Sequence, residues 1–215
     1  MERIILSNTI PTIFKNDNKG LSSEIWLKEL SFLRGRTYLI EAASGMGKSS
    51  LCSFIYGIRA DYEGNIFFDD KNIATLSKND WNDIRRHSLS LLFQGLSLFD
   101  ELTGLENVML KNRLTGHKTK GEIEEMFSKL GVEDKINQLA GIMSFGQRQR
   151  VALIRALCQP FDFLILDEPV SHLDNDNIKI FSEMMIEEVS RQNAGLIITS
   201  IGKHPQIKYD KILRL

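Results

Sequence analysis

The stretch that decides the fold is Tyr38-Leu39-Ile40-Glu41-Ala42-Ala43-Ser44-Gly45-Met46-Gly47-Lys48-Ser49-Ser50. An apolar run that predicts a strand leads through small residues into a predicted helix. Gly45 and Gly47 let the backbone point several N–H groups at one anion, and the helix N-terminus adds the positive end of its dipole. Lys48 supplies a cation for phosphate, and the Ser49 hydroxyl is a candidate Mg²⁺ ligand. We expect the phosphate contacts to come from Ala42, Ser44, Gly45, Gly47, Lys48, Ser49 and Ser50.

Ala42 departs from the phosphate-loop pattern G-x-x-x-x-G-K-[ST], which has glycine at this position. Alanine is the smallest replacement, and it is unfavourable only where the backbone needs a positive φ. We expect phosphate binding to survive, because Gly47, Lys48 and Ser49 are all present. A glycine-rich turn without function is the alternative, and the strand–loop–helix context disfavours it.

A second apolar run, Phe163-Leu164-Ile165-Leu166, ends in Asp167 and Glu168. A continuous apolar run predicts a strand that is buried on both faces, and ligands of open α/β sheets bind at the carboxyl ends of such strands. There Asp167 could hold Mg²⁺, directly or through water, and Glu168 could orient or deprotonate an attacking water. Two solvated carboxylates in a turn are the alternative, which the phosphate loop makes the weaker one.

Composition excludes several classes of protein. The chain has 215 residues, of which 42% are hydrophobic and 26% charged, with a formal net charge of −1. These values exclude disorder as the main state, and the lack of a basic excess makes nucleic acid a poor candidate partner. Two cysteines make neither a disulfide framework nor a metal site. No targeting signal or membrane-length apolar run occurs, so we expect action at a membrane only through a partner.

Short apolar runs alternate with helical patterns, which predicts an α/β fold with a mainly parallel sheet. The expected strands are 3–7, 37–41, 65–68, 89–93, 163–166 and 196–199, with a last strand within 208–215. Helical periodicity marks 120–130 and 146–157. We therefore expect a single domain, 1–215, with an α/β core (1–94 and 160–215) and an inserted helical subdomain (about 95–159).

Together these motifs resemble the ATP-binding cassette (ABC) ATPases, and the resemblance extends over nearly the whole chain. Gln94 lies where the family has its Q-loop glutamine, Met143-Ser144-Phe145-Gly146-Gln147 replaces the LSGGQ signature, and Ser171-His172-Leu173-Asp174 is similar to the D-loop. The resemblance implies a P-loop NTPase core with an N-terminal antiparallel β portion and the helical insertion. It also implies Mg²⁺-dependent ATP hydrolysis by two ABC subunits, identical or different, around two ATP molecules. A separate multi-span membrane subunit would hold this pair at the cytoplasmic face of the cell membrane.

The family pattern carries roles onto matching residues. It implies catalytic roles for Glu168, Gln94 and Ser200, and Mg²⁺ contacts for Ser49, Gln94 and Asp167. ATP contacts from the signature and D-loop would come from Ser144, Gly146, Gln147 and Asp174. Phe14 is the candidate for stacking on adenine, a core phenylalanine being the alternative, and Trp26 is less well placed.

Three departures from the family pattern bear on turnover. Ser200 occupies the position of the switch histidine, Phe145 replaces the first glycine of the signature, and Met143 replaces its leucine. A serine can donate a hydrogen bond but carries no charge. We therefore expect slow turnover, or a different partner subunit that completes one site, unless His172 or His204 fills the role.

Three functions stay open at this stage: a transporter ATPase, a non-transport cassette of the iron–sulfur assembly type, and a degenerate subunit that binds ATP with little hydrolysis. For the first, the segment around Gln94 and 96–110 is expected to contact the membrane subunit, since it contains more apolar residues than a free loop. Packing within the helical subdomain is the alternative for these residues, which are Phe93, Leu96, Leu98, Phe99 and Leu102.

Overall fold

Two sheets form the framework of the computed structural model, which describes residues 1–15 and 22–215. The antiparallel sheet has the order β2 (Glu29–Leu33), β1 (Arg3–Pro11), β4 (Tyr62–Phe68) and β5 (Lys71–Asn72). The second sheet is parallel, with the order β6 (Leu89–Leu92), β7 (Phe163–Asp167), β8 (Gly195–Ser200), β3 (Thr37–Glu41) and β9 (Lys211–Arg214). The predicted fold class is confirmed.

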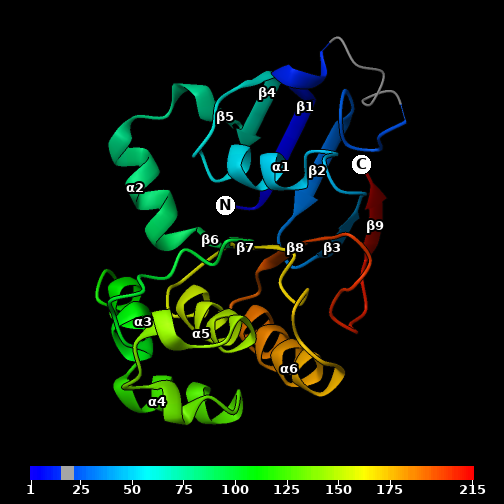
Figure 1. The fold of residues 1–215 in the computed structure, drawn as a ribbon. Coiled ribbons are helices and arrows are strands. Elements are labelled where there is room, and N and C mark those ends of the chain that lie inside the picture. Colours follow the sequence, from blue (N-terminus) through cyan, green and yellow to red (C-terminus); the bar gives the residue numbers. More distant parts are fainter. Residues whose placement is uncertain (16–21) are drawn as a thin grey trace.

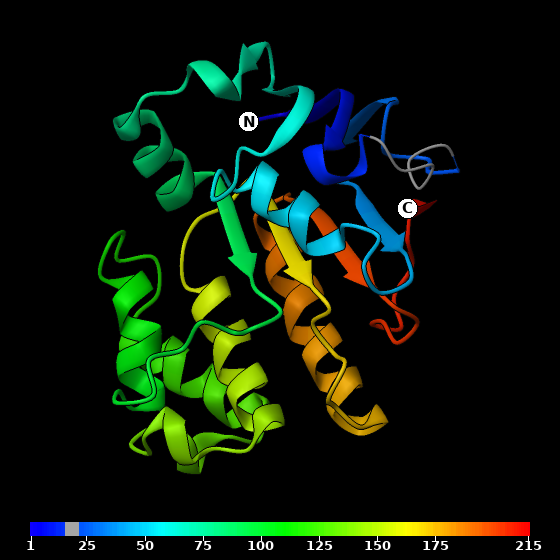
Figure 2. The same cartoon turned by 45° about the horizontal axis from the view of Figure 1, so that its top comes forward.

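The α-helices divide between the two sheets and the segment that joins β6 to β7 (Figures 1 and 2). α3 (Gly104–Asn112), α4 (Lys120–Lys129) and α5 (Phe145–Leu157) belong to that joining segment, and they gather at one end of the molecule. The other helices are α1 (Lys48–Ile55), α2 (Lys78–His87) and α6 (Asn175–Arg191). Short 3-10 helices lie at Thr12–Phe14, Ile73–Thr75, Glu133–Lys135 and Ala140–Ile142.

The parallel sheet is buried on both faces. Successive side chains of a strand point to opposite sides, so each strand contributes to two hydrophobic clusters. On β7, Leu164 and Leu166 belong to the hydrophobic cluster that includes α5 and α6. Phe163 and Ile165 belong to a second cluster, shared with α1 and the antiparallel sheet. Each of these side chains is fully buried, which stabilises the fold by roughly 1.5–3 kcal/mol per residue.

The strand register brings the candidate residues to one edge of the sheet. β3 and β7 both pair in parallel with β8, so Glu41 lies opposite Ser200 and Asp167 lies opposite Thr199. The chain leaves all three strands at the same edge. In the described residues, no helix combines the length and hydropathy needed to cross a membrane.

Some elements were not predicted. One of them is β2, which alternates exposed and buried residues over five positions and pairs with β1 in the antiparallel sheet. α6 is the longest helix of the described chain, with 17 residues, and Asp174 caps it. Predicted elements shift slightly at their ends: α1 begins at Lys48 and α5 at Phe145.

Candidate functional site

The loop between β3 and α1 rests on two aromatic side chains. Gly47 has φ 95°, and a Cβ there would lie 3.0 Å from Cε2 of Phe14 and 3.1 Å from Cζ2 of Trp26. Nε1 of Trp26 donates a hydrogen bond of 3.2 Å to the carbonyl of Met46. Glycine at position 47 therefore meets both a conformational and a steric requirement.

Lys48 lies inside the loop it follows. Its Nζ donates to the carbonyl oxygens of Ala42 (2.9 Å) and Ala43 (3.0 Å) and lies 3.5 Å from Oε1 of Glu168. Ala42 is not among the described residues with positive φ, so its methyl group adds no backbone strain. The departure at position 42 is thus compatible with the loop conformation.

A chain of polar contacts joins the loop to the ends of two strands. Ser49, on α1, donates from Oγ to Oε1 of Gln94 at 3.3 Å, and Nε2 of Gln94 donates to Oε2 of Glu168 at 3.3 Å. Glu168 in turn contacts Lys48. The structure therefore brings together four predicted residues from three separate parts of the sequence.

Glu168 is held in a conformation that is rare for its residue type. Its φ is +50°, which costs roughly 1–3 kcal/mol for a side chain of this kind. Its N–H donates to both the carbonyl and Oγ1 of Thr199, each at 3.2 Å, and its carbonyl accepts from Nε2 of Gln149 at 3.4 Å. Gln149 and Thr199 are supporting residues that the sequence analysis did not identify, because they are distant in sequence.

Asp167 is the last residue of β7, directly before Glu168, and it is buried. Its Oδ1 accepts a hydrogen bond of 2.6 Å from Oγ1 of Thr199. Burial, and secondarily the Asp167 carboxylate, raises the pKa of the Cys52 thiol on α1. Cys52 is therefore a neutral thiol and no nucleophile for this site.

One pocket, with a volume of about 330 Å³, collects most of the predicted residues. Phe14 lines it but is only 7% exposed, whereas its neighbour Ile13 is 78% exposed. This burial agrees with the core-phenylalanine alternative and leaves Ile13 as the more accessible apolar side chain. Ile13 and Arg59 were missed by the sequence analysis. The pocket residues are Ile13, Phe14, Ser44, Gly45, Gly47, Lys48, Ser49, Ser50, Arg59, Gln94 and Glu168.

The signature residues lie outside that pocket, at the N-terminus of α5. Ser144 caps the helix: its Oγ accepts from the N–H of Gln147 at 3.3 Å, and Oε1 of Gln147 accepts from the N–H of Ser144 at 2.9 Å. Phe145 is 40% exposed, and its ring centroid lies 4.2 Å from that of His172. Gly146 also approaches the D-loop, since a Cβ there would lie 3.5 Å from the carbonyl of His172.

Asp174 likewise does not reach the pocket. It caps α6 by accepting from the N–H of Asn177 at 2.9 Å, and this hydrogen bond lowers the pKa of its carboxyl. Ser144, Phe145, Gly146, Gln147 and Asp174 are exposed or half-buried on the surface of the single chain, whereas Met143 is buried in the core.

Ser200 ends β8 with its hydroxyl directed into its own turn. Its Oγ donates to the carbonyl of Lys203 at 2.9 Å and accepts from the N–H of Gly202 at 2.9 Å. The residue is fully buried. In this arrangement the hydroxyl does not join the chain formed by Ser49, Gln94 and Glu168.

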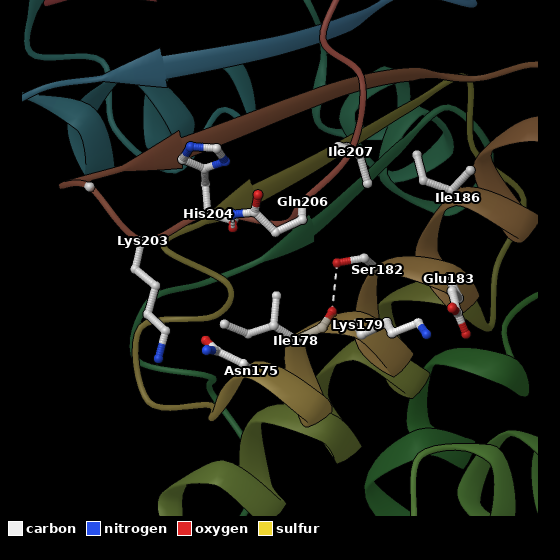
Figure 3. Close-up of a pocket in the computed structure, with 11 residues that line it drawn as sticks. Asn175, Ile178, Lys179, Ser182, Glu183, Ile186, Lys203, His204, Gln206 and Ile207 are labelled. Carbon is white, nitrogen blue, oxygen red and sulfur yellow. Dashed lines mark hydrogen bonds between the residues drawn. The ribbon is translucent and has the colours of Figure 1, made fainter.

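His204 lies in a separate pocket, between α6 and the segment after β8 (Figure 3). This pocket has a volume of about 840 Å³ and includes Ile178, Lys179 and Ile207. The ring of His204 packs edge-on against Tyr209 at 5.4 Å. The structure therefore separates His204 from the phosphate loop.

Comparison with known proteins identifies the family. Residues 28–171 match the family model described as ABC transporter. This chain belongs to the ABC transporter family of ATP-binding cassettes. It is an ATPase of that family and binds ATP.

Individual relatives agree with this assignment. An uncharacterized ABC transporter ATP-binding protein of Bacillus subtilis (strain 168), YclH, is 33% identical over 183 residues, which cover 81% of this chain and 78% of that protein. The lipoprotein-releasing system ATP-binding protein LolD of Buchnera aphidicola subsp. Schizaphis graminum (strain Sg) is 33% identical over 80% of this chain and 76% of its own length. The dimeric structure of MJ0796, a bacterial ABC transporter cassette, matches with a TM-score of 0.78 at 24% identity, over 92% of this chain and 88% of that one.

Proposed function

We propose that this chain hydrolyses ATP at a site shared by two ABC subunits and thereby drives a separate membrane transporter subunit. The observation that carries the proposal is the convergence of Lys48, Ser49, Gln94 and Glu168 at the edge of the parallel sheet. Only the fold as a whole brings these four side chains together. Their chemistry matches the requirements of phosphoryl transfer.

Each of these residues has a role in ATP hydrolysis that follows from its chemistry. Lys48 and the loop N–H groups hold the β- and γ-phosphates. Glu168 accepts a proton from the attacking water, which Gln94 helps to orient. Charge that develops on the γ-phosphate is stabilised by groups already fixed in position.

The donor set fits Mg²⁺. This ion prefers oxygen ligands and is commonly held by one or two protein oxygens together with phosphates and waters. Oγ of Ser49 and Oε1 of Gln94 lie 3.3 Å apart, and the buried carboxylate of Asp167 ends the neighbouring strand β7. The ion would neutralise phosphate charge, and these three residues would hold it.

The position of the signature supports a two-subunit site. Ser144, Gly146 and Gln147 lie at a helix N-terminus, which attracts anions, yet they lie outside the pocket of their own chain. A second ABC subunit, a copy of this chain or a different one, would place its own signature over this pocket. ATP would then hold the pair together until hydrolysis.

The membrane subunit would bind beside Gln94. Phe93 and Phe99 line a groove, whereas Leu96 is buried in the core and Leu98 packs against it. The docking proposal therefore keeps Phe93 and Phe99, and the packing alternative applies to Leu96 and Leu98. Such docking would hold the pair at the cytoplasmic face of the membrane.

Substitution of Glu168 by glutamine tests the proposal. Glutamine keeps the shape but cannot accept the proton, so ATP stays bound and the dimer accumulates. Size-exclusion chromatography of Glu168→Gln with ATP and Mg²⁺ should show a dimer, and hydrolysis should fall at least about a hundredfold. Glu183→Gln, a change in an exposed glutamate of α6, is the control. Wild-type turnover in Glu168→Gln would place the base elsewhere.

A further inference from the structure

The groove beside Gln94 has an apolar wall and a cationic floor. Phe93, Phe99, Leu110 and Leu114 supply apolar side chains, of which Phe99, Leu110 and Leu114 are 55%, 42% and 49% exposed. The groove has a volume of about 310 Å³. Its remaining residues include Lys111, Arg155 and Tyr56, which we call the floor of the groove.

The floor holds positive charges that have only neutral acceptors. Nζ of Lys111 donates to Oε1 of Gln159 (2.6 Å), the hydroxyl of Tyr56 (3.3 Å) and the carbonyl of Arg85 (3.4 Å). Arg155 donates to the carbonyls of Ser97 and Leu96 at 2.6 and 2.5 Å.

Arg85 adds a third charge to this group. It donates to the carbonyls of Tyr56 and Gly57. Within residues 1–15 and 22–215, none of Lys111, Arg85 and Arg155 has an ion pair with a carboxylate. Three cations therefore share one partly buried place without a counter-charge.

Another buried lysine of the chain, Lys118, has a carboxylate partner. Lys118 pairs with Glu188 at 2.8 Å, and both side chains are less than a tenth exposed. A buried charge is normally compensated in this way, because desolvation is costly. Lys111 has no such partner among the described residues, and burial, together with the charges of Arg155 and Arg85, lowers its pKa to about 8.

We infer that the partner segment that occupies this groove carries an aspartate or glutamate between apolar residues, and that its carboxylate pairs with Lys111 and Arg155. The apolar side chains of the segment cover Phe99, Leu110 and Leu114, and the carboxylate supplies the missing counter-charge. This inference rests on the proposed function, because it takes the segment to belong to the membrane subunit. Charge complementarity then selects the correct subunit among those with similar apolar segments.

The test uses the full chain and the membrane subunit that purifies with it from detergent-solubilised membranes. Lys111→Met removes the charge and keeps the side-chain length, and we expect it to weaken binding of that subunit at least about tenfold. Lys129→Met is the matched control, because Lys129 also lies on a helix but already pairs with Glu125. Thermal unfolding and ATP binding of both variants establish that they fold.

A charge exchange identifies the carboxylate. Lys111→Glu should abolish binding, and one Asp→Lys or Glu→Lys change in a cytoplasmic segment of the membrane subunit should restore it. Equal binding by wild type, Lys111→Met and Lys129→Met would overturn the inference while leaving the proposed function intact. Failure of the wild type to bind any membrane subunit would remove both. Loss of binding to protein-free phosphatidylglycerol vesicles in Lys111→Met would assign the floor to a lipid phosphate and overturn the inference.

Discussion

At the scale of single residues, Lys111 carries a charge that destabilises the folded chain. Its folded pKa is about 8, below the ordinary 10.5, while Arg85 and Arg155 face it and stay charged. The unfolded chain therefore binds more protons between these two values, and stability from this group rises with pH across that range. Between pH 7.5 and 9.5, the free energy of unfolding of the wild type should therefore rise by about 1–2 kcal/mol more than that of Lys111→Met.

Denaturant titrations of both proteins at the two pH values measure this change. The comparison cancels other groups that titrate in the same range, such as the cysteines. A difference between wild type and Lys111→Met that does not change with pH would contradict the assigned burial of the charge.

Ser200 is the residue at which the family resemblance leads us to expect a switch histidine. Its hydroxyl is engaged by Gly202 and Lys203, so it does not stabilise charge on the γ-phosphate in this conformation. Ser200→His supplies a donor at the strand end next to Thr199, and we expect ATP turnover in the assembled complex to rise at least about tenfold. Steady-state hydrolysis measures this, with Ser190→His on the exposed side of α6 as control.

His172 or His204 is the alternative residue for the role of the switch histidine. Unchanged turnover in Ser200→His, together with collapse in His172→Ala or His204→Ala, would show that another histidine has taken the role. His172 is the stronger of the two, because its ring lies against Phe145 at the signature, whereas His204 packs on Tyr209.

At the scale of elements, α5 connects the signature to the end of β7. Gln149, on α5, donates to the carbonyl of Glu168 and so supports its positive φ. Gln149→Met keeps the volume and removes the donor. We expect kcat to fall about tenfold while ATP affinity is unchanged, because Gln149 positions the base and does not line the pocket.

Two measurements separate this role from general destabilisation. Nucleotide titration gives the affinity and single-turnover hydrolysis gives the rate, with Gln206→Met, an exposed change, as control. A parallel loss of ATP affinity, or a wild-type rate, would remove Gln149 as a positioning residue.

At the scale of the whole molecule, the proposed two-subunit site predicts different effects for changes in the pocket and at the start of α5. The pocket contains Lys48 and Glu168, whereas Ser144 lies at the exposed start of α5. Ser144→Arg should therefore leave ATP binding by the monomer unchanged and abolish the ATP-dependent dimer in the Glu168→Gln background. Ser128→Arg, on the exposed face of α4, is the control. Loss of monomer ATP affinity in Ser144→Arg would place the signature within the site of its own chain.

The sequence by itself determined the local features that depend on short-range chemistry. The glycines and Lys48 at the phosphate loop, the apolar run before Asp167, and the helix starts are readable because each depends on neighbours within a few residues. The roles of Gln94 and the signature could be expected only from family resemblance, and their part in catalysis stays a prediction.

Only the tertiary structure decided what meets at the sheet edge. Parallel pairing through β8 places Thr199 beside Asp167 and beneath Glu168, and α5 brings Gln149 to the same point. Packing of the whole chain also buries Phe14 and Leu96, which were candidates for binding surfaces. It places Lys111 and Arg155 along one groove, with Arg85 next to Lys111. Hydrophobic patterning specifies which strands are buried, but it does not specify strand order. Contacts such as those of Glu168 with Gln149 and Thr199, 19 and 31 positions away, therefore follow from the packing of the whole chain.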